Sequence, residues 1–267
     1  MPTLRDKTWT WGYVIPGTPP GDVPFVGKSS CSLETAAAYI GTPNVVFMNS
    51  NHWQDRLNPE HLDRLSGCRQ VLCGLQHGAY AETARRVSQL SKTYGNIGGG
   101  LIDDFLEFHG PSGSMNPEST RAVYEALKSE NSALRLYVVH YTWQDHTLLL
   151  PHLPYFDVIN LWVWVANRHT WEVTMNEFEI EKLTRLTGKP VLLGLFMHDY
   201  GGTGGPVPLD IMELQFRKAV ALAKAGTIEG FVVLQSGWFD REDHRPQVQW
   251  MKQYLDWAFG TATTREA

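Results

Sequence analysis

The sequence contains no uninterrupted apolar run of 18 residues or more, which is about the minimum for a membrane-spanning helix. We therefore do not expect the protein to bind or span a membrane. The first seven residues also lack the apolar core of a secretory signal. We expect a cytoplasmic protein, or a secreted or periplasmic one if a signal peptide has been removed.

Positive charge is scarce. The chain has 23 Lys and Arg residues against 28 Asp and Glu residues, a net charge of −5, so it offers no basic field for a phosphate backbone and we expect no nucleic-acid partner. Cofactor signatures are missing too: no Gly-x-Gly-x-x-Gly follows a strand-like run, and no His-Glu-x-x-His occurs. We expect no cofactor and no bound metal.

Cysteine is rare as well. The three cysteines, Cys31, Cys68 and Cys73, form neither a Cys-x-x-Cys pair nor a zinc-ligand spacing. Cys73 lies in an apolar run, where a cysteine is typically a small buried hydrophobic residue. This usage favours a reducing compartment.

Aromatic residues, in contrast, are abundant, with 10 Trp, 10 Tyr and 11 Phe. Many of them fall in eight apolar runs that are rich in β-branched or aromatic residues, most of them separated by a helix-like segment. The runs lie within residues 9–15, 45–48, 70–75, 98–107, 134–141, 156–164, 190–197 and 228–234.

The segments between the runs carry helix signals. Ser32 before one segment and Asn-Pro-Glu at 58–60 and 116–118 are typical helix starts. Helical patterns are expected at 79–94, about 175–187 and 209–225. A last helix, opened by Pro246, is expected to carry its aromatic residues Trp250, Tyr254 and Trp257 toward the core.

Strands that are apolar throughout are typical of a parallel sheet covered by helices. Eight strand–helix units in about 250 residues fit a closed (β/α)8 barrel better than an open sheet. No linker divides the chain. We therefore predict a single (β/α)8 domain over residues 1–267, with a frayed tail from about residue 260.

The stretch from Gly98 to Glu107 looks like a strand, yet it contains residues that are unfavourable in strands. Three glycines and two aliphatic residues lead into adjacent carboxylates, Asp103 and Asp104, with Glu107 three residues later. Glycines within a strand permit close backbone approach, and adjacent aspartates are poor strand formers. Such local conflict is typical of a functional site, although an Asp-rich turn would also explain it.

The Gly-Leu-Ile-Asp-Asp-Phe segment resembles the end of strand 4 in (β/α)8 glycoside hydrolases, and most closely the hexosaminidases of the O-GlcNAcase type. The resemblance covers about ten residues and the barrel pattern. It implies glycosidic bond cleavage, with Asp104 as the general acid and Asp103 as the orienting or stabilising carboxylate. A small-molecule or oligosaccharide substrate is implied with it.

The chemistry of glycosidic cleavage also suits a pair of adjacent aspartates, independently of the resemblance. Glycosidic cleavage needs a proton donor and negative charge near an oxocarbenium-like centre, and neighbouring carboxylates raise one pKa toward neutrality. Adjacent strand residues point to opposite faces, however, so both aspartates reach one site only if the strand ends or bulges there. Otherwise Glu107, Asp199 and Asp240 are the candidates for a second carboxylate.

In a (β/α)8 barrel the site lies at the carboxyl ends of the strands. Polar or aromatic side chains follow nearly every predicted strand, and amides and tryptophans there suit hydrogen bonding to hydroxyls and stacking on a sugar. The candidate substrate-binding residues are Asn49, Gln76, His77, His140, Tyr141, Asn160, Trp162, Trp164, His198, Tyr200, Gln235, Trp238 and Asp240. Alternation along 156–164 places Asn160, Trp162 and Trp164 on one face, which we expect to be the barrel interior.

Two alternatives remain open. His140, His198 and an aspartate could hold a divalent cation in a metal-dependent hydrolase on the same fold, although the first strand carries no His-x-His. The same aromatic and amide side chains would also serve a carbohydrate-binding barrel without catalysis.

Overall fold

Eight parallel strands close into a barrel in the computed structural model, which describes residues 2–48, 57–106, 115–175 and 177–261. Each strand pairs with its neighbour in the chain, and the last pairs with the first, which confirms the predicted (β/α)8 barrel. The strands are β1 (Thr8–Gly12), β4 (Asn44–Phe47), β5 (Gln70–Gly74), β6 (Ile97–Ile102), β7 (Arg135–Tyr141), β8 (Val158–Trp162), β9 (Val191–Phe196) and β10 (Gly230–Leu234).

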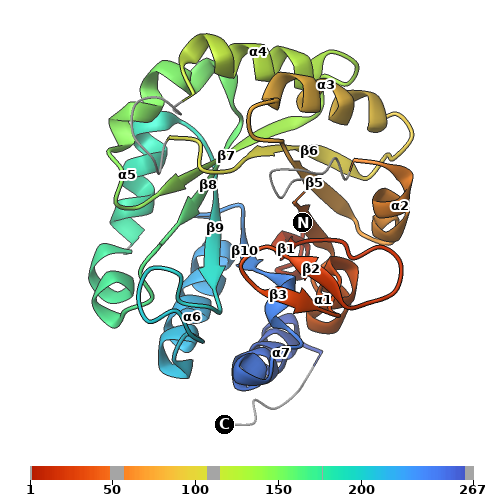
Figure 1. Ribbon diagram of the computed structural model, residues 1–267. Helices are drawn as coiled ribbons and strands as arrows, with labels where there is room; N and C mark the ends of the chain where they lie inside the picture. Colours follow the sequence, from red (N-terminus) through yellow and green to blue (C-terminus); the bar gives the residue numbers. More distant parts are fainter. Residues whose placement is uncertain (1, 49–56, 107–114, 176, 262–267) are drawn as a thin grey trace.

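Helices surround the barrel on all sides (Figure 1). The α-helices are α1 (Leu33–Ile40), α2 (Pro59–Leu62), α3 (Tyr80–Leu90), α4 (Pro117–Lys128), α5 (Glu177–Thr187), α6 (Leu209–Ala225) and α7 (Arg245–Phe259). Short 3-10 segments cover Arg5–Lys7, Asp63–Leu65, His146–Tyr155, Ser236–Trp238 and Glu242–His244, and a π-helical turn covers Thr170–Thr174. None of the described helices is long and apolar enough to cross a membrane.

Local chemistry explains several helix ends. The Asn58 and Asn116 side chains accept hydrogen bonds from the first turns of α2 and α4, as the Asn-Pro-Glu pattern predicts. Ser32 precedes α1 but does not cap it, because its hydroxyl donates to Glu34 and accepts from the Ile15 N–H instead.

Two interior glycines provide space that a larger residue would fill. A Cβ atom on Gly99 of β6 would lie 2.0 Å from the Arg135 carbonyl oxygen of β7, which confirms the expected close backbone approach in this run. A Cβ atom on Gly194 of β9 would lie 2.0 Å from the Trp162 ring of β8. Gly99 therefore lets β6 approach the backbone of β7 closely, and Gly194 leaves room for the Trp162 ring.

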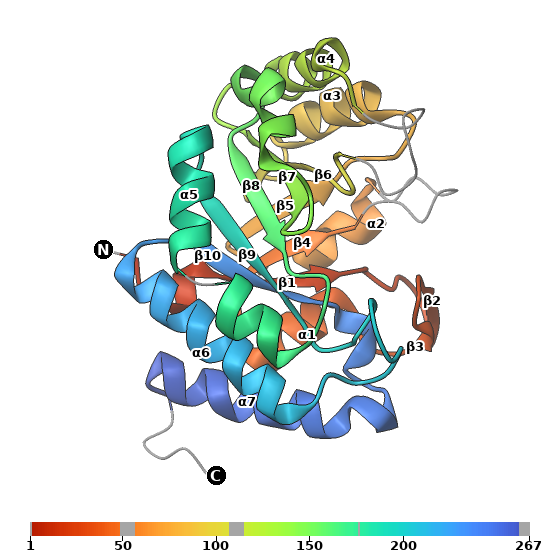
Figure 2. The ribbon, with the colours of Figure 1, turned by 90° about the vertical axis from the view of Figure 1, so that its left-hand side faces the viewer.

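A hairpin that the sequence pattern does not predict, β2 (Gly21–Val23) and β3 (Gly27–Ser29), is inserted between β1 and α1. Its strands are only three residues long, too short for a recognisable alternation. Asp240 fixes one end of it, since its carboxylate accepts from the Ser29 hydroxyl at 2.8 Å and the Ser30 N–H at 2.6 Å. The hairpin lies on the side of the barrel opposite the N-terminus (Figure 2).

Helix α7 begins at Arg245, close to the predicted start, but not all its aromatic residues face inward. Tyr254 is buried and Trp250 half-buried, whereas Trp257 is 40% exposed, so the expectation for Trp257 was wrong. Its position on the helix turns it away from the strands. Gly260 ends α7 with a positive φ, and most of the predicted frayed tail, residues 262–267, lies outside the described residues.

Candidate active site

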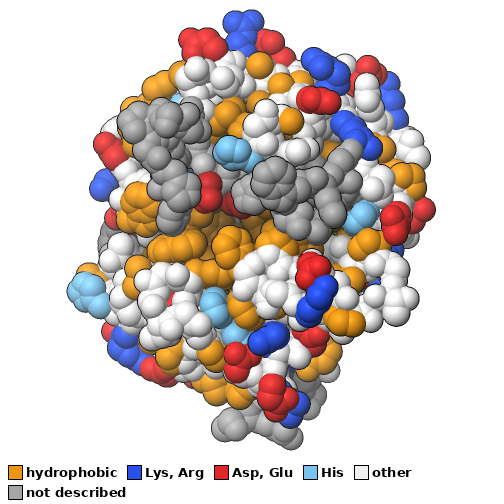
Figure 3. All heavy atoms as spheres, viewed as in Figure 1, with side chains coloured by type: hydrophobic (Ala, Val, Ile, Leu, Met, Phe, Trp, Pro, Cys, Tyr) orange, Lys and Arg blue, Asp and Glu red, His pale blue; other side chains and the backbone are white. Residues whose placement is uncertain are grey.

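A pocket of about 120 Å³ opens at the carboxyl ends of the barrel strands. Figure 3 shows hydrophobic side chains gathered at the centre of this face. The lining combines two carboxylates with many aromatic rings and consists of Trp11, Tyr13, Phe25, Asp103, Asp104, Tyr141, Trp162, Trp164, Phe196, Tyr200, Leu234 and Gln235.

Asp103 and Asp104 reach this pocket together because β6 ends at Ile102. Both aspartates lie in the turn that follows the strand, and Asp104 has a positive φ of 46°. The turn removes the strict alternation of a strand, so neighbouring side chains need not face opposite sides. The condition for a shared location of the two carboxylates is thus met.

The two carboxylates differ in environment. Asp103 is half-buried, and burial together with the nearby charge of Asp104 raises its pKa from 3.8 to about 7. Asp104 is exposed, and its Oδ1 accepts a hydrogen bond of 2.5 Å from the Tyr141 hydroxyl. With a pKa of about 7, Asp103 carries a proton at slightly acid pH, which makes it the candidate proton donor of the pair.

The aromatic lining is a set of rings packed largely at right angles. Trp164 meets Tyr141 at 5.6 Å and Phe196 at 5.9 Å, both with interplanar angles of 89°. Trp162 meets Trp11 edge-on at 5.6 Å. Such edge-to-face contacts are the favoured arrangement of aromatic pairs and hold the pocket wall rigid.

Asn160 positions one of these rings. Its Oδ1 accepts from the Trp162 indole N–H at 2.9 Å, and its amide donates to the Leu192 carbonyl at 3.0 Å. Asn160 is fully buried and does not line the pocket. The predicted interior face of 156–164 is therefore correct, with Asn160 supporting the wall and both tryptophans forming it.

Gln235 and Tyr200 form a second polar group at the wall. The Tyr200 hydroxyl accepts from the Trp238 indole N–H at 2.7 Å and from the Gln235 amide at 3.2 Å. The same amide lies 3.3 Å from the Pro24 carbonyl, which fixes the orientation of the carboxamide. The Gln235 Oε1 atom is buried and has no hydrogen-bond partner among the described residues.

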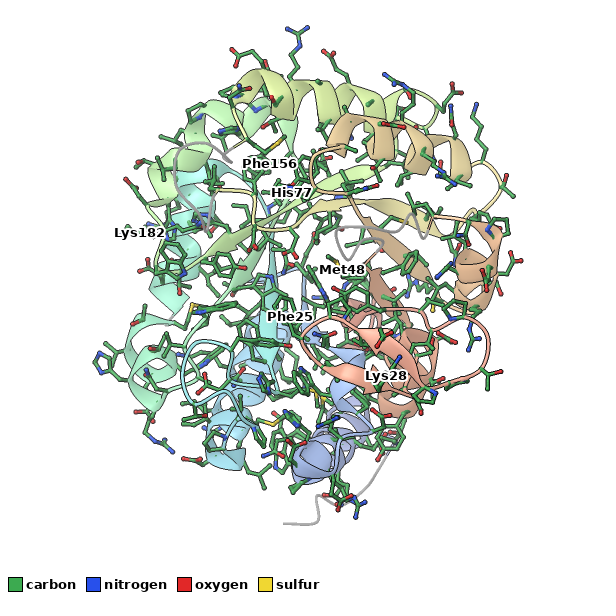
Figure 4. All side chains as sticks on the ribbon, viewed as in Figure 1. Phe25, Lys28, Met48, His77, Phe156 and Lys182 are labelled. Atoms are coloured by element: carbon green, nitrogen blue, oxygen red, sulfur yellow. The ribbon has the colours of Figure 1, made fainter. Side chains whose placement is uncertain are left out.

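Backbone strain is concentrated at this pocket. In the described part of the chain, the non-glycine residues with positive φ are Phe25, at 65°, and Asp104, at 46°, and both line it. Phe25 lies in the hairpin turn, is 82% exposed and contacts the Tyr200 ring edge-on at 6.2 Å. Figure 4 shows Phe25 near the centre of the barrel mouth. Strained residues often cluster at functional sites.

Two predicted histidines lie behind the pocket wall. His140 is fully buried and hydrogen-bonds through Nε2 to His146 at 2.8 Å, and burial lowers its pKa to about 3. His198 bonds to His244 at 3.0 Å and stacks on the Trp238 ring at 4.0 Å. Trp238 itself is buried and acts on the pocket only through Tyr200.

Other predicted residues also lie away from the lining. Gln76 is half-buried and His77 exposed, and His77 contacts Tyr80 beside α3. Asp199 is buried and its Oδ2 accepts from Thr203, so it shapes its own loop. Asp240 holds the hairpin. Asn49 and Glu107 lie outside the described residues.

Within the described part of the chain, the histidines considered as ligands for a metal-dependent hydrolase are not brought together with an aspartate in one site. His140 and His198 bond to different histidines, and no group of three or more His, Cys, Asp or Glu side chains suited to a metal occurs in the described ranges.

Five lining residues were missed by sequence reasoning. Trp11 and Tyr13 share one face by alternation with Trp9, a signal that was present in the first run. Phe196 and Leu234 end apolar strands and carry no polar cue, and nothing in the sequence distinguishes Phe25. The missed residues are Trp11, Tyr13, Phe25, Phe196 and Leu234.

No protein-family model and no curated protein matches the chain. Among solved structures, a candidate alpha-L-fucosidase from Bacteroides thetaiotaomicron matches with a TM-score of 0.61 and 11% identity, covering 98% of this chain and 96% of that one. A GH128 endo-beta-1,3-glucanase from Amycolatopsis mediterranei, in complex with laminaritriose, matches at 0.56 and 12%, covering 86% and 88%.

The tryptophan synthase alpha-subunit of Pyrococcus furiosus also matches, with a TM-score of 0.53 and 9% identity, covering 96% of this chain and 98% of that one. The names of these proteins describe different activities. Sequence identities as low as these establish only that the fold is shared. The chain is similar to (β/α)8 barrel proteins that include several glycoside hydrolases.

Proposed function

We propose that the protein is a glycoside hydrolase-like enzyme that acts at the carboxyl end of its barrel. The observation that carries the proposal is the presence of Asp103 and Asp104 together in one aromatic pocket. Carboxylate pairs are the usual catalytic groups of glycosidic cleavage, and this face is where active sites of (β/α)8 enzymes lie. The glycoside hydrolases among the solved structures of this fold support the same class.

The different environments suggest a role for each carboxylate. Protonated Asp103 donates its proton to the glycosidic oxygen as the bond from that oxygen to the anomeric carbon breaks, and the bonding pair stays on the oxygen. Charged Asp104, held by Tyr141, stabilises the positive charge on the anomeric carbon. A water molecule then adds to that carbon and returns a proton to Asp103.

This assignment exchanges the roles implied by the resemblance to the O-GlcNAcase type, in which Asp104 would be the acid. The raised pKa of Asp103 and the hydrogen bond from Tyr141 to Asp104 favour the exchange. A proton donor must carry its proton near working pH, and a pKa of about 7 meets that need.

The test is turnover of a broad aryl-glycoside panel by the wild type, Asp103→Asn and Asp104→Asn. Both substitutions should lower kcat/KM by about 10²–10⁴-fold, the usual range for acid–base groups. Substrates with a good leaving group need little protonation, so Asp103→Asn should lose much less on dinitrophenyl glycosides than Asp104→Asn does.

Asp210→Asn is a suitable control, because Asp210 is an exposed carboxylate of α6 that pairs with Arg168. It should turn over substrates like the wild type. If the wild type binds sugars but turns over no member of the panel, the non-catalytic carbohydrate-binding barrel replaces this proposal.

A further inference from the structure

The pocket is rich in negative and aromatic groups. Of its twelve described lining residues, eight are aromatic and two are aspartates, and none of the twelve is Lys, Arg or His. A neutral sugar hydroxyl both donates and accepts hydrogen bonds, so a site for neutral sugars needs donors as well as acceptors. The carboxylate pair of this lining carries negative charge that none of the other ten described residues balances, which points to a ligand that carries positive charge.

The charged group and the unpaired buried polar atom at the wall are acceptors. Asp103 and Asp104 provide carboxyl oxygens, and the Tyr141 hydroxyl already donates to Asp104. The Gln235 Oε1 is an acceptor without a partner on a side chain that is 2% exposed, and its orientation is fixed by the Pro24 carbonyl. A buried acceptor left unpaired is costly, so a ligand donor at this point would be strongly favoured. Neutral donors are present as well. They are the Tyr200 hydroxyl, whose oxygen accepts from two neighbours, the Tyr13 hydroxyl, the indole N–H groups of Trp11 and Trp164, and the proton on Asp103.

The aromatic walls favour positive charge for a second, independent reason. Ring faces carry partial negative charge, and cages of aromatic rings are a common way to bind ammonium groups. Trp162 and Trp164 are among the walls, and indole is the strongest cation–π partner. None of the described lining residues is a cationic side chain that could compete for these faces. The carboxylates and the aromatic rings therefore both favour a positively charged ligand.

We propose that this pocket binds a sugar ring carrying a free, protonated amine, so that the substrate class is a glycoside of an unacetylated amino sugar. The volume of about 120 Å³ suits one six-membered ring. The ammonium donates to Asp104 and to the Gln235 Oε1 and lies against the aromatic faces. This substrate class rests on the proposed function, but the binding preference is measured without turnover.

The experiment is calorimetric titration of the wild type with glucosamine, N-acetylglucosamine and glucose at about pH 6 and low salt. Glucosamine should bind about tenfold or more tightly than either neutral sugar, as expected for one desolvated cation–π or charge contact. High salt should reduce the preference, because it screens charges at an open mouth.

Single substitutions test which side chains produce the preference for glucosamine. Asp104→Asn should abolish the preference for glucosamine, and Gln235→Met should weaken glucosamine binding while leaving glucose binding less affected. Asp210→Asn, on the outer surface, should preserve the wild-type preference. Circular dichroism and thermal unfolding would confirm that each variant is folded before its binding is interpreted.

Equal affinity for the three sugars, tighter binding of N-acetylglucosamine, or no binding of glucosamine would each overturn the inference. A preference for glucosamine in a protein that cleaves no glycoside would support the inference and overturn the proposed function. Cleavage of neutral or acetylated glycosides without a preference for the amine would support the proposed function and overturn the inference.

Discussion

Neutralising Asp103 should stabilise the folded protein near neutral pH, although it removes a group that we propose to be catalytic. Burial and the charge of Asp104 raise the pKa of Asp103 from 3.8 to about 7 in the folded state. In the unfolded chain the same group titrates near its ordinary value. Between about pH 4 and pH 7 the folded state therefore holds a proton that the unfolded state has lost, and stability falls as pH rises.

The magnitude follows from the size of this shift. A difference of about 3 pKa units, at about 1.4 kcal/mol per unit, sets an upper limit of about 4 kcal/mol. Asp103 is only half-buried beside an open mouth, and part of the rise in its pKa comes from the charge of Asp104. Solvent screening weakens both contributions and reduces the expected effect to about 2 kcal/mol. The favourable term is complete below about pH 4 and is lost as pH rises through 7.

Urea unfolding followed by tryptophan fluorescence, at steps from about pH 4 to pH 8, measures the effect. The wild type should lose about 2 kcal/mol relative to Asp103→Asn over this interval. Asp22→Asn removes an exposed carboxylate paired with Lys28 and should parallel the wild type. If the curves of the wild type and Asp103→Asn are parallel as well, the reasoning is refuted.

Three further predictions concern the walls of the pocket. Gly194→Ala should lower the free energy of unfolding by about 1–3 kcal/mol in urea titrations, because its Cβ would overlap Trp162; an unchanged midpoint would contradict this packing. Phe25→Gly should leave the Tm unchanged or raise it, since glycine tolerates the positive φ, while calorimetry shows weaker ligand binding; a large loss of stability would contradict this view. Tyr141→Phe removes the donor to Asp104, so kcat/KM should fall by about tenfold or more, as expected for a hydrogen bond to a carboxylate; an unchanged kcat/KM would separate this contact from the rate.

The barrel could be predicted because each strand is buried on both faces. Eight apolar runs with helical segments between most of them admit few other arrangements, and the structure has all eight as barrel strands. The hairpin β2–β3 could not be predicted, since its pairing depends on contacts between Ser29, Ser30 and the distant Asp240. Three-residue strands carry no pattern of their own.

Within the site, local conflict and alternation were informative, whereas the position of a residue near a strand end was informative only in part. It found Tyr141, Tyr200 and Gln235 of the lining, but it did not separate them from residues that lie behind the wall. Asp103 and Asp104 lie in the pocket because the strand stops before them. His140 and Tyr141 are adjacent on β7, so only one of them can face the interior. Tyr141 does, and His140 points to His146 on the outer layer.

The attachment of the hairpin has a consequence for how the entrance can be altered. The hairpin lies between β1 and α1, outside the register of the eight strands, and Asp240 fixes one end of it to the segment that follows β10. Its tip carries the ring that covers the mouth, yet that ring contributes little to the core because it is mostly exposed. Phe25 could therefore be exchanged for other residues that accept its positive φ, retuning which ligands enter, whereas Val23 and Val26 beside it are buried in the core and must be kept.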